Sequence, residues 1–449
     1  MKKVITYGTF DLLHQGHINL LKRAKALGDY LIVGVTTENY DRMRGKLNVR
    51  KSLVERMEDV RSTGYADEII VEEYEGQKID DIQKYGIDIF VIGSDWVGQF
   101  DYLKDYCEVI YLERTKGISS TQLRNDKSLL LNIGIIGTGR IARRFVQESK
   151  YVSGVNIRSV YNPHKHSAQL FSEQFELELY FDRFEDFIQS VDAVYIASPH
   201  ITHYEYIKRA LINGKHVLCE KPLVLSKEEA NELYNLAKEK HLILREAIKT
   251  AYCPAFSHLI SLLKSGSIGK IVDVDASFSK LLQNKNCREL QKEQEGGSMT
   301  ELASYPLLAI IKILGTHCKN VQFFSKIQDK VDVFTRGVIT YDDAVASFKV
   351  GLGAKTEGEL IVTGTKGYAY VPAPWWKTAY FELRYESQDM TKKYFYPFDG
   401  DGLRYELLQF YLLVCDKNQK SFKLSDEESI CINGVISTFL KGNNTVILE

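Results

Sequence analysis

The sequence predicts an α/β protein with two successive parallel-sheet domains, followed by an α+β domain built on an antiparallel sheet. Three observations predict this class. From residue 3 to about 126, short apolar segments rich in β-branched residues alternate with longer stretches of helical period. A second alternation of the same kind begins at 129–146 with a strand marked by glycines. After about residue 270, alternating strands follow one another with few helices between them.

The first domain is predicted to span residues 1–126. Its helices are expected at 17–28 and 52–63, and the polar segment 122–128 joins it to the next domain. Its expected strands are apolar throughout, which is typical of a parallel sheet with helices on both faces. These strands are expected at 3–7, 30–36, 69–72, 87–93 and 108–112.

The second domain is predicted over residues 127–250 and the third over residues 251–449. The strands of the second domain are expected at 131–136, 155–161, 191–197, 215–218 and 242–246. The strands of the third domain are expected within 271–281, 332–350, 358–371 and 378–396, and its last helices at 403–415 and 425–440. Consecutive strands with few helices predict an open-faced antiparallel sheet.

The composition excludes several classes of protein. The chain has 449 residues, and 58 Lys and Arg against 59 Asp and Glu give a formal net charge of −1. A chain this neutral lacks the broad basic field that binds nucleic acid, and no apolar run approaches the ~18–20 residues of a membrane span. We therefore predict no nucleic-acid partner and no membrane insertion.

The number and spacing of the cysteines indicate the redox state of the cellular compartment. Seven cysteines are scattered along the chain without a CxxC pair. An odd count in so long a chain argues against a disulfide framework or a structural zinc site and favours a reducing compartment. The first residues reach Asp11 and His14 too soon for a secretory signal peptide. We predict a cytoplasmic protein.

The first candidate site follows the first expected strand. Residues 8–17 read GTFDLLHQGH, so a turn after the strand leads into a helix near His17. Backbone N–H groups at such a turn and at a helix start bind phosphate oxygens. His14 and His17 can both face one small volume and stabilise charge in phosphoryl or nucleotidyl transfer. A metal-binding pair or a structural pair of histidines is the alternative.

A second anion-binding segment follows the last strand of the same domain. Residues 113–121 read ERTKGISST and offer an arginine, a glycine and several hydroxyls. With both segments in this order, residues 1 to about 126 resemble the HxGH nucleotidyltransferase superfamily, a Rossmann-like fold. Within it, the match is to glycerol-3-phosphate cytidylyltransferases and related polyol-phosphate cytidylyltransferases.

This resemblance implies that the phosphate of an alcohol phosphate attacks the α-phosphorus of CTP, with Mg²⁺ bound to the triphosphate and pyrophosphate leaving. It implies catalytic roles for His14, His17, Lys46 and Arg114. Arg44 would assist Lys46, and Trp96 would flank the second substrate or the base. The implied CTP-binding residues are Thr9, Phe10, Asp95, Thr115 and Thr121.

Two positions depart from the glycerol-3-phosphate enzymes. Gly64, in STGYADEI, stands where those enzymes tend to carry an arginine. Ser94 stands where they have an acidic residue before the Asp-Trp pair. The residues for the chemistry are intact, so these changes leave the identity of the polyol open.

The second domain opens on a dinucleotide-binding fingerprint. Residues 137–142 read GTGRIA between an expected strand and an expected helix, and the two glycines allow the pyrophosphate of a dinucleotide to approach the backbone. The second strand ends without the Asp or Glu that binds a ribose 2′-hydroxyl. Asn162, His164 and Lys165 stand there instead, and with Arg140 they favour NADP over NAD. Ordinary solvation of Arg140 and Lys165 is the alternative.

The rest of the chain carries a second resemblance. Residues 193–222 end in Glu-Lys-Pro after a strand, and residues 245–252 (REAIKTAY) and 296–306 (GGSMTELASYP) follow. From about residue 130 onward, the chain resembles the Gfo/Idh/MocA family of NAD(P)-dependent oxidoreductases. In that family a Rossmann domain precedes an open-faced sheet domain.

Hydride transfer to a carbonyl needs a group that polarises the oxygen and a proton donor. By resemblance, Lys221 polarises the oxygen, Tyr305 is the acid/base, and Glu301, one helical turn earlier, orients the substrate or the lysine. A half-buried structural role is the alternative for Tyr305, and a structural role is the alternative for His203. The implied cofactor-binding residues are Gly137, Gly139, Arg140, Ile141, Asn162, Ser198, Pro199, His203 and Glu220.

Together, the two halves predict a bifunctional enzyme of CDP-polyol synthesis. The reductase would make the polyol moiety from a carbonyl sugar or sugar phosphate, and the product would serve a surface polymer such as capsule or teichoic acid. Two alternatives stay open: the reductase acts on the CDP-linked product, or one half is a non-catalytic nucleotide-sensing module. The aromatic stretch 370–396 is sheet surface or a subunit interface, and we expect a homo-oligomer.

Overall fold

The structure is a computed structural model. It describes residues 1–11, 13, 15–37, 40–41, 46, 49, 51, 53–113, 130–284, 287–416 and 423–449. These residues form two compact units. The first comprises Met1–Asn132, Ser149–Val160 and His164–Phe181, and the second comprises Ile133–Glu148, Tyr161–Pro163 and Asp182–Glu449. The predicted domain boundaries at 126 and 250 stay predictions.

The N-terminal sheet is parallel, as predicted. Among the described residues its strand order is β3-β2-β1-β4-β5. β1 pairs in parallel with β2 and β4, β2 pairs in parallel with β3, and β4 pairs in parallel with β5. Apolar residues form a core cluster on each side of the sheet, which explains the continuous apolar strands. The strands are β1 (Lys3–Gly8), β2 (Tyr30–Thr36), β3 (Glu68–Glu72), β4 (Ile89–Gly93) and β5 (Glu108–Leu112), and the helices are α1 (Gln15–Lys25), α3 (Leu53–Ser62) and α4 (Gln77–Tyr85).

The second sheet has the order β11-β10-β9-β6-β7-β8. The chain enters at β6 and later strands lie on both sides of it, so the strand order reverses there. In open α/β sheets a nucleotide binds at the carboxyl ends of the strands at this point. The strands are β6 (Leu131–Ile136), β7 (Val155–Tyr161), β8 (Leu179–Phe181), β9 (Ala193–Ile196), β10 (His216–Glu220) and β11 (Leu244–Ala247). The helices are α5 (Arg140–Ser149), α6 (Lys165–Phe175), α7 (Phe184–Gln189), α8 (His203–Ile212) and α9 (Lys227–Glu239).

The third sheet has the order β19-β18-β17-β16-β12-β15-β14-β13-β20. It is mixed, whereas the sequence analysis expects an antiparallel sheet, because β12 pairs in parallel with β15 and β13 with β20. The chain between β12 and β15 holds helices and a hairpin, and a crossover of this length permits parallel pairing. The strands are β12 (Ile271–Ser279), β13 (Asn320–Gln328), β14 (Val331–Thr340), β15 (Val345–Gly351), β16 (Leu360–Gly364), β17 (Tyr368–Val371), β18 (Tyr380–Arg384), β19 (Lys392–Phe395) and β20 (Thr445–Ile447).

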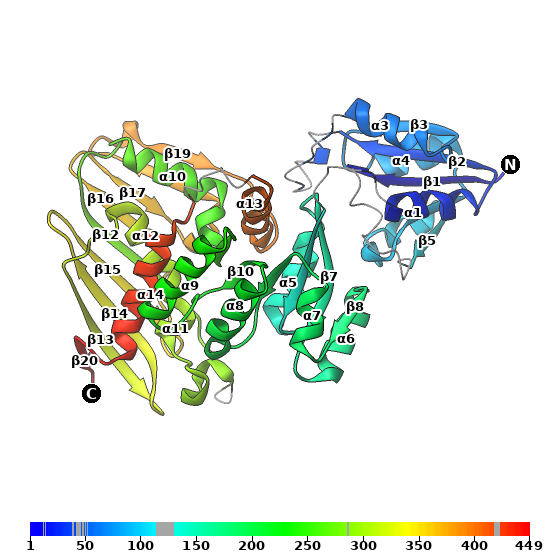
Figure 1. The fold of residues 1–449 in the computed structure, drawn as a ribbon. Coiled ribbons are helices and arrows are strands. Elements are labelled where there is room, and N and C mark those ends of the chain that lie inside the picture. The colour runs from blue at the N-terminus through cyan, green and yellow to red at the C-terminus, as the bar shows by residue number, and fades with distance from the viewer. Residues whose placement is uncertain are drawn as a thin grey trace. The chain divides into compact units, whose positions relative to one another are not determined.

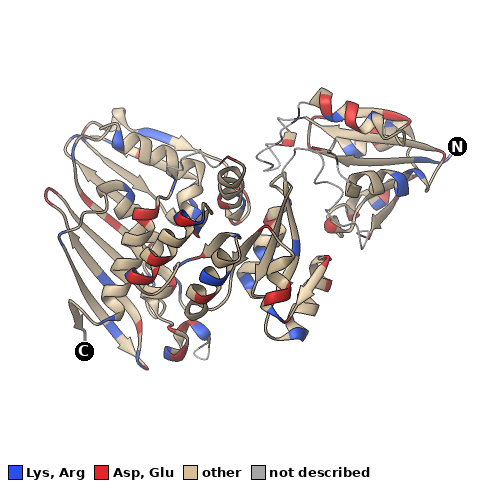
Figure 2. Cartoon of the chain, in the orientation of Figure 1, with Lys and Arg blue, Asp and Glu red and all other residues tan. Residues whose placement is uncertain are grey.

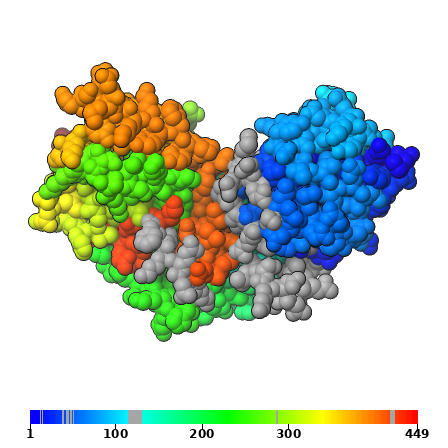
Figure 3. Space-filling model, turned by 90° about the horizontal axis from the view of Figure 1, so that it is seen from above, coloured from blue at the N-terminus to red at the C-terminus, as the bar shows by residue number. Residues whose placement is uncertain are grey.

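Helices cover one face of this sheet. α10, α11 and α12 pack on its strands, and α14 packs against α9 and α12 (Figure 1). In the space-filling view, α10 (green) lies beside β18 and β19 (orange) (Figure 3). The helices are α10 (Pro254–Lys264), α11 (Ser298–Leu302), α12 (Ser304–Leu314), α13 (Leu403–Cys415) and α14 (Asp426–Leu440).

Charge and hydropathy of the elements agree with an ordinary globular chain. Acidic and basic residues are interspersed along the elements of both parts (Figure 2). Over the residues that the structure describes, no helix combines the length and the apolar character needed to cross a membrane.

Candidate active sites

The first site lies at the carboxyl end of β1. Thr9 and Phe10 follow this strand, and His17 stands in the first turn of α1, half-buried. The Phe10 ring is 2% exposed and lies edge-on to the His17 ring, with 5.5 Å between centroids. The side chain of Phe10 therefore supports the histidine from the core. Its predicted contact with CTP stays a prediction.

A buried ion pair, which the sequence analysis does not single out, holds this turn. The hydroxyls of Thr9 and Thr36 donate to the two carboxyl oxygens of Asp41, at 2.8 and 2.7 Å. Arg56 donates to the backbone oxygens of Thr9 and Thr36, each at 2.8 Å, and lies 3.7 Å from Asp41. Both charged side chains are fully buried. The pair thus fixes the ends of β1 and β2 relative to each other.

A signal for this pair exists in the sequence. Arg56 stands four residues before Val60 on the buried stripe of α3, where an apolar residue is expected. An arginine at such a position is normally paired, because a buried lone charge is costly. The partner Asp41 precedes the helix and carries no signal of its own.

The other predicted residues of this site are described only in part. Lys46 is half-buried, and its backbone N–H donates to the Asp41 backbone oxygen at 2.8 Å. Asp95 and Trp96, both half-buried, form a 3₁₀ turn directly after β4, the neighbour of β1. They therefore lie at the same sheet edge as Thr9. The residues outside the described ranges are His14, Arg44, Arg114, Thr115 and Thr121.

The dinucleotide fingerprint forms a tight turn between β6 and α5. Gly137 has φ +100°, and a Cβ there would lie 2.6 Å from the Ala197 backbone oxygen, so only glycine fits. A Cβ on Gly139 would meet nothing within 4 Å, which leaves room for a ligand at that point. The Asn162 amide donates to the Thr138 hydroxyl at 2.9 Å and holds the turn from the end of β7. The cradle fits the close backbone approach that a dinucleotide pyrophosphate needs.

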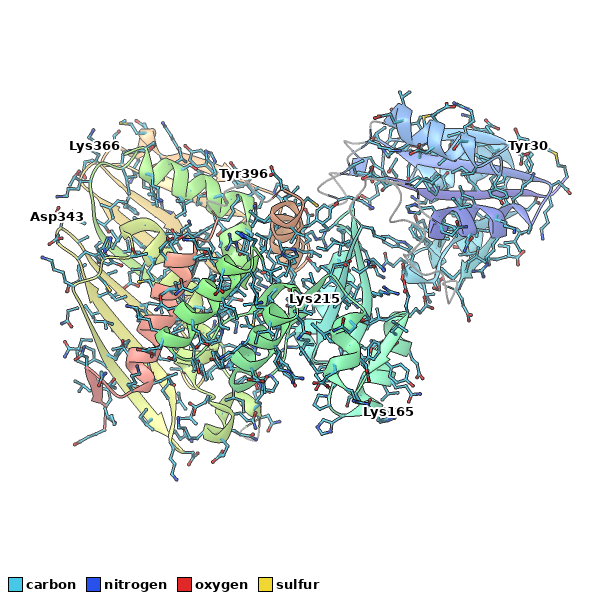
Figure 4. The ribbon with its side chains drawn as sticks, viewed as in Figure 1. Tyr30, Lys165, Lys215, Asp343, Lys366 and Tyr396 are labelled. Carbon is cyan, nitrogen blue, oxygen red and sulfur yellow. The ribbon has the colours of Figure 1, made fainter. Side chains whose placement is uncertain are left out.

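The residues expected to set the cofactor preference are exposed. The Arg140 side chain is 67% exposed and lies 3.7 Å from Glu289, while Ile141 is half-buried. Lys165, labelled in Figure 4, begins α6 and is exposed. Their exposure is compatible with binding a 2′-phosphate and with ordinary solvation, so the preference for NADP stays a prediction.

His203 ties two backbone segments together. Its Nδ1 lies 2.9 Å from the Pro222 backbone oxygen, and its Nε2 lies 3.0 Å from the Ser198 backbone oxygen. Burial lowers its pKa to about 4 although the two backbone oxygens favour the charged form, so the ring is neutral at pH 7 and donates to one of them. The predicted cofactor contacts of Ser198, exposed Pro199 and His203 stay predictions.

Lys221 stands directly after β10, and its peptide bond to Pro222 is cis. Its ammonium donates to the Glu301 backbone oxygen at 2.9 Å. The structure therefore joins the lysine and Glu301 through the main chain of Glu301. α11 ends at Leu302 and α12 begins at Ser304, so Glu301 and Tyr305 lie on two successive helices instead of one.

Two residues that the sequence analysis did not pick out surround the Glu301 carboxylate. Arg288 donates to it at 3.0 Å, and the Nδ1 of His200 lies 3.8 Å away. Burial, together with Lys221 and Arg288, lowers the pKa of His200, so its ring is neutral. The repeated histidines of SPHITH hint at His200, whereas nothing in the local pattern marks Arg288.

Tyr305 stands at the start of α12 and is 8% exposed. The Phe278 ring contacts it edge-on at 5.1 Å, and Trp376 stacks on Phe278 at 3.7 Å. Burial and the carboxylates of Glu220 and Glu406 raise the pKa of Tyr305, so its hydroxyl is protonated at neutral pH. A protonated buried hydroxyl can act as a proton donor.

The carboxyl groups beside Lys221 face the interior. Glu220 accepts a hydrogen bond from the Tyr195 hydroxyl at 2.6 Å and is 9% exposed. Glu246 accepts from the Leu223 N–H at 3.0 Å and from the Asn433 amide at 3.1 Å. Burial raises the pKa of Glu246 to about 7. This carboxyl anchors the segment after Lys221 to α14.

α5 is anchored at its far end. Glu148, in its last turn, accepts from the Arg404 guanidinium at 3.1 and 3.2 Å and from the backbone N–H groups of Asp401 at 2.8 Å and Arg404 at 3.1 Å. Glu148 and Arg404 are both buried. The helix that begins at the dinucleotide turn is thus fixed to the start of α13.

Three segments of the chain match known families. Residues 5–126 match the family described as cytidylyltransferase-like. Residues 131–248 match the oxidoreductase family with an NAD-binding Rossmann fold, and residues 256–370 match the Gfo/Idh/MocA C-terminal domain.

Individual relatives agree with these matches. Glycerol-3-phosphate cytidylyltransferase of Bacillus spizizenii is 55% identical over 130 residues, which are 29% of this chain and 100% of that protein. A dTDP-3,4-didehydro-2,6-dideoxy-α-D-glucose 3-reductase of Actinomadura kijaniata is 30% identical over 211 residues, 46% of this chain and 63% of that protein. A 3-ketoreductase of Actinomadura kijaniata, solved with NADP and TDP-benzene, has a TM-score of 0.64 at 24% identity and covers 71% of this chain and 99% of its own.

Proposed function

This chain belongs to the cytidylyltransferase family in its N-terminal part and to the Gfo/Idh/MocA NAD(P)-dependent oxidoreductases in the remainder, and we propose that it makes a CDP-linked polyol by two reactions. One reaction transfers CMP from CTP to a polyol phosphate. The other reduces a carbonyl precursor of the polyol with NAD(P)H. The observation that carries the proposal is the 55% identity over the whole length of a glycerol-3-phosphate cytidylyltransferase, joined in one chain to the oxidoreductase.

In the first reaction, an oxygen of the polyol phosphate forms a bond to the α-phosphorus of CTP, and the bond to pyrophosphate breaks. His14, His17, Lys46 and Arg114 bind the phosphates and stabilise the charge that builds up in the transition state. The CTP contacts come from Thr9, the Phe10 backbone, Asp95, Thr115 and Thr121. Mg²⁺ would enter the site bound to the triphosphate of CTP, whose charge it neutralises.

In the second reaction, bound NADPH or NADH supplies the hydride. The Lys221 ammonium, held by the Glu301 backbone oxygen, polarises the carbonyl oxygen of the substrate, and Tyr305 donates a proton to it. The Glu301 carboxylate, fixed by Arg288, orients the substrate. The cofactor contacts come from Gly137, Gly139, Arg140, Ile141, Asn162, Ser198, Pro199, His203 and Glu220, and Arg140 with Lys165 favours NADP.

The names of the relatives support a sugar as the carbonyl substrate. They also favour a second order of reactions, because the Actinomadura reductase is named for a nucleotide-linked sugar. In that order the cytidylyltransferase acts first and the reductase acts on the CDP-linked product. In either order the product is an activated polyol phosphate donor, which suits synthesis of a cell-surface polymer in the cytoplasm.

A homo-oligomer is part of the proposal. The outer strands of the third sheet expose Tyr368 (37%) and Phe395 (73%), and the Arg384 guanidinium lies 4.7 Å from the centroid of the Tyr370 ring. Aromatic residues and arginine are enriched at protein interfaces. Sedimentation velocity of the full chain tests this: a single monomeric species at micromolar concentration would exclude it.

Pyrophosphate release tests the first reaction. The full chain receives CTP, Mg²⁺ and, one at a time, glycerol phosphate, pentitol phosphates and hexitol phosphates. We expect release with one of them, and a loss of about 10²-fold or more in kcat for His17→Ala. Lys22→Ala, an exposed change on the same helix, is the matched control. Absence of both release and CTP binding would exclude the cytidylyltransferase activity.

Oxidation of NADPH and NADH tests the second reaction. The panel holds free keto sugars, their phosphates and CDP-linked forms, and so separates the two orders. Binding of the cofactor without turnover on every compound would support a nucleotide-sensing role for this half instead.

A further inference from the structure

The three-residue turn after β4, Ser94–Trp96, contacts residues that come much later in the chain. Residues 149–160 and 164–181 belong to the same compact unit as residues 1–132, so these contacts lie within one unit. None of the three residues of the turn is buried, and the core of the N-terminal sheet therefore fixes the turn only in part. The residues that contact it fall within 131–248, the segment that matches the oxidoreductase family.

Lys150 contacts Asp95. It comes directly after α5, and its ammonium donates to the Asp95 backbone oxygen at 2.7 Å and lies 4.0 Å from the Asp95 carboxylate. The Lys150 and Asp95 side chains are 28% and 35% exposed, so solvent and salt screen their charges only in part. The hydrogen bond to the backbone restrains the path of the chain at Asp95, and the nearby ammonium restrains its side chain.

The same segment contacts Trp96. The Lys150 ammonium lies 5.9 Å from the centroid of the indole ring, a distance at which a cation is attracted to an aromatic face. The Tyr151 ring meets the indole edge-on at 6.4 Å. Phe100, which packs on the buried Phe90 at 5.3 Å, lies 6.1 Å from the indole and ties it to the N-terminal core. Residues of both matched segments thus restrict the orientation of Trp96.

Ser94 is bound by a carboxylate. Its hydroxyl donates to Glu176, which follows the last residue of α6 in a left-handed conformation with φ +53°. Ser94 stands where the glycerol-3-phosphate enzymes have an acidic residue. A carboxylate therefore lies beside this position in the present chain too, but it comes from the end of α6.

The turn lies at the edge of the sheet that carries the first site. β4 is the parallel neighbour of β1, so the turn and Thr9 follow adjacent strands at one edge of the sheet. In the proposed site Asp95 contacts CTP, and Trp96 flanks the second substrate or the base. Residues that only hold such groups in position still affect binding and rate, because small displacements spoil the geometry of the bound substrate.

We propose that Lys150, Tyr151 and Glu176 are positioning residues of the cytidylyltransferase, which hold the Ser94–Trp96 turn in the shape that binds the polyol phosphate. The inference rests on the proposed transfer of CMP. It makes the first site incomplete without residues of the oxidoreductase segment. CTP depends less on the turn, because its phosphates have further contacts in the proposed site, His17 and Lys46 among them.

Lys150→Met in the full chain tests the proposal, because it keeps most of the length of the side chain and removes the ammonium. The KM for the polyol phosphate should rise about 5-fold or more, which corresponds to the loss of one hydrogen bond, while kcat and the KM for CTP change less than about 2-fold. Lys150→Arg, which keeps a donor, should recover part of the loss.

Glu176→Ala should raise the same KM, and Glu173→Gln, an exposed change on α6, is the matched control that should leave it unchanged. An unchanged KM for the polyol phosphate in Lys150→Met would overturn the proposal, as would an equal loss of affinity for CTP.

A second measurement needs no acceptor. Amide hydrogen exchange of residues 94–100 in the full chain should be about 3-fold faster or more in Lys150→Met, because the turn loses its hydrogen bond and its cation contact. Peptides from β2 should exchange equally in both chains, which excludes general unfolding. If residues 94–100 also exchange equally, Lys150 does not hold the turn and the proposal fails, whether or not any polyol phosphate accepts CMP. Faster exchange together with an inactive wild-type chain would instead exclude the proposed transfer, and the positioning role with it.

Discussion

The buried arginine of the N-terminal unit offers a prediction with a magnitude. In Arg56→Met the guanidinium loses its hydrogen bonds to the backbone oxygens of Thr9 and Thr36 at 2.8 Å and of Lys51 at 3.0 Å. The change also leaves the Asp41 carboxylate buried without its cation. Removal of one partner from a buried pair costs about 3–5 kcal/mol. The N-terminal unit should lose stability by that amount.

Hydrogen exchange of the full chain measures the loss within this unit alone. Peptides from β1 and β2 should exchange about 10²-fold faster or more, since about 1.4 kcal/mol corresponds to a factor of ten. Arg61→Met on the same helix is the control: its side chain is 59% exposed and forms a surface pair with Glu58, so exchange should change little. The double variant Asp41→Asn/Arg56→Met should lose less free energy of unfolding than the sum of the losses in the two single variants. Equal exchange in Arg56→Met and Arg61→Met would refute the reasoning.

Three further predictions concern the oxidoreductase part. Gly137→Ala should weaken NADPH binding at least about 10-fold in a fluorescence titration, because the new Cβ would lie 2.6 Å from the Ala197 backbone oxygen. An unchanged affinity for NADPH would contradict the binding of the cofactor at the Gly137 turn. Lys221→Met should lower kcat about 10²–10⁴-fold in NADPH oxidation while NADPH affinity is retained, and a normal kcat would exclude Lys221 from the chemistry. Burial raises the pKa of Glu246 from 4.5 to about 7, so the folded state binds this proton more tightly than the unfolded state does. The free energy of unfolding should therefore decrease by up to about 3 kcal/mol as the pH rises from 4.5 to about 7. Glu246→Gln should flatten this decline in urea unfolding at pH 5 and pH 7.5, and an unchanged slope would assign it to another group.

Local patterns in the sequence are enough to predict the two parallel sheets and the dinucleotide turn. Apolar strands that alternate with helical periods suffice for the first two sheets, since each strand–helix–strand unit is local. GTGRIA suffices for the turn at Gly137, because only glycine tolerates that φ and that close contact. Family resemblance, and not pattern, supplies Lys221, Glu301 and Tyr305, and the joining of Lys221 to the Glu301 backbone depends on how distant segments meet.

What the sequence does not predict is set by distant contacts. The parallel pairing of β12 with β15 depends on how a long crossover folds, which alternation within a strand does not reveal. β13 was not expected, and it pairs with β14 and β20, the latter from the end of the described chain. Arg288 reaches the Glu301 carboxylate from a segment whose own pattern marks only a turn.

The Glu148–Arg404 pair fixes the last turn of α5 to the start of α13, while the first turn of α5 follows the dinucleotide turn. A single hydrogen-bonded helix therefore connects the dinucleotide turn to α13. Binding of the cofactor at the Gly137 turn should therefore change the amide hydrogen exchange of residues 400–406, which lie at the opposite end of α5.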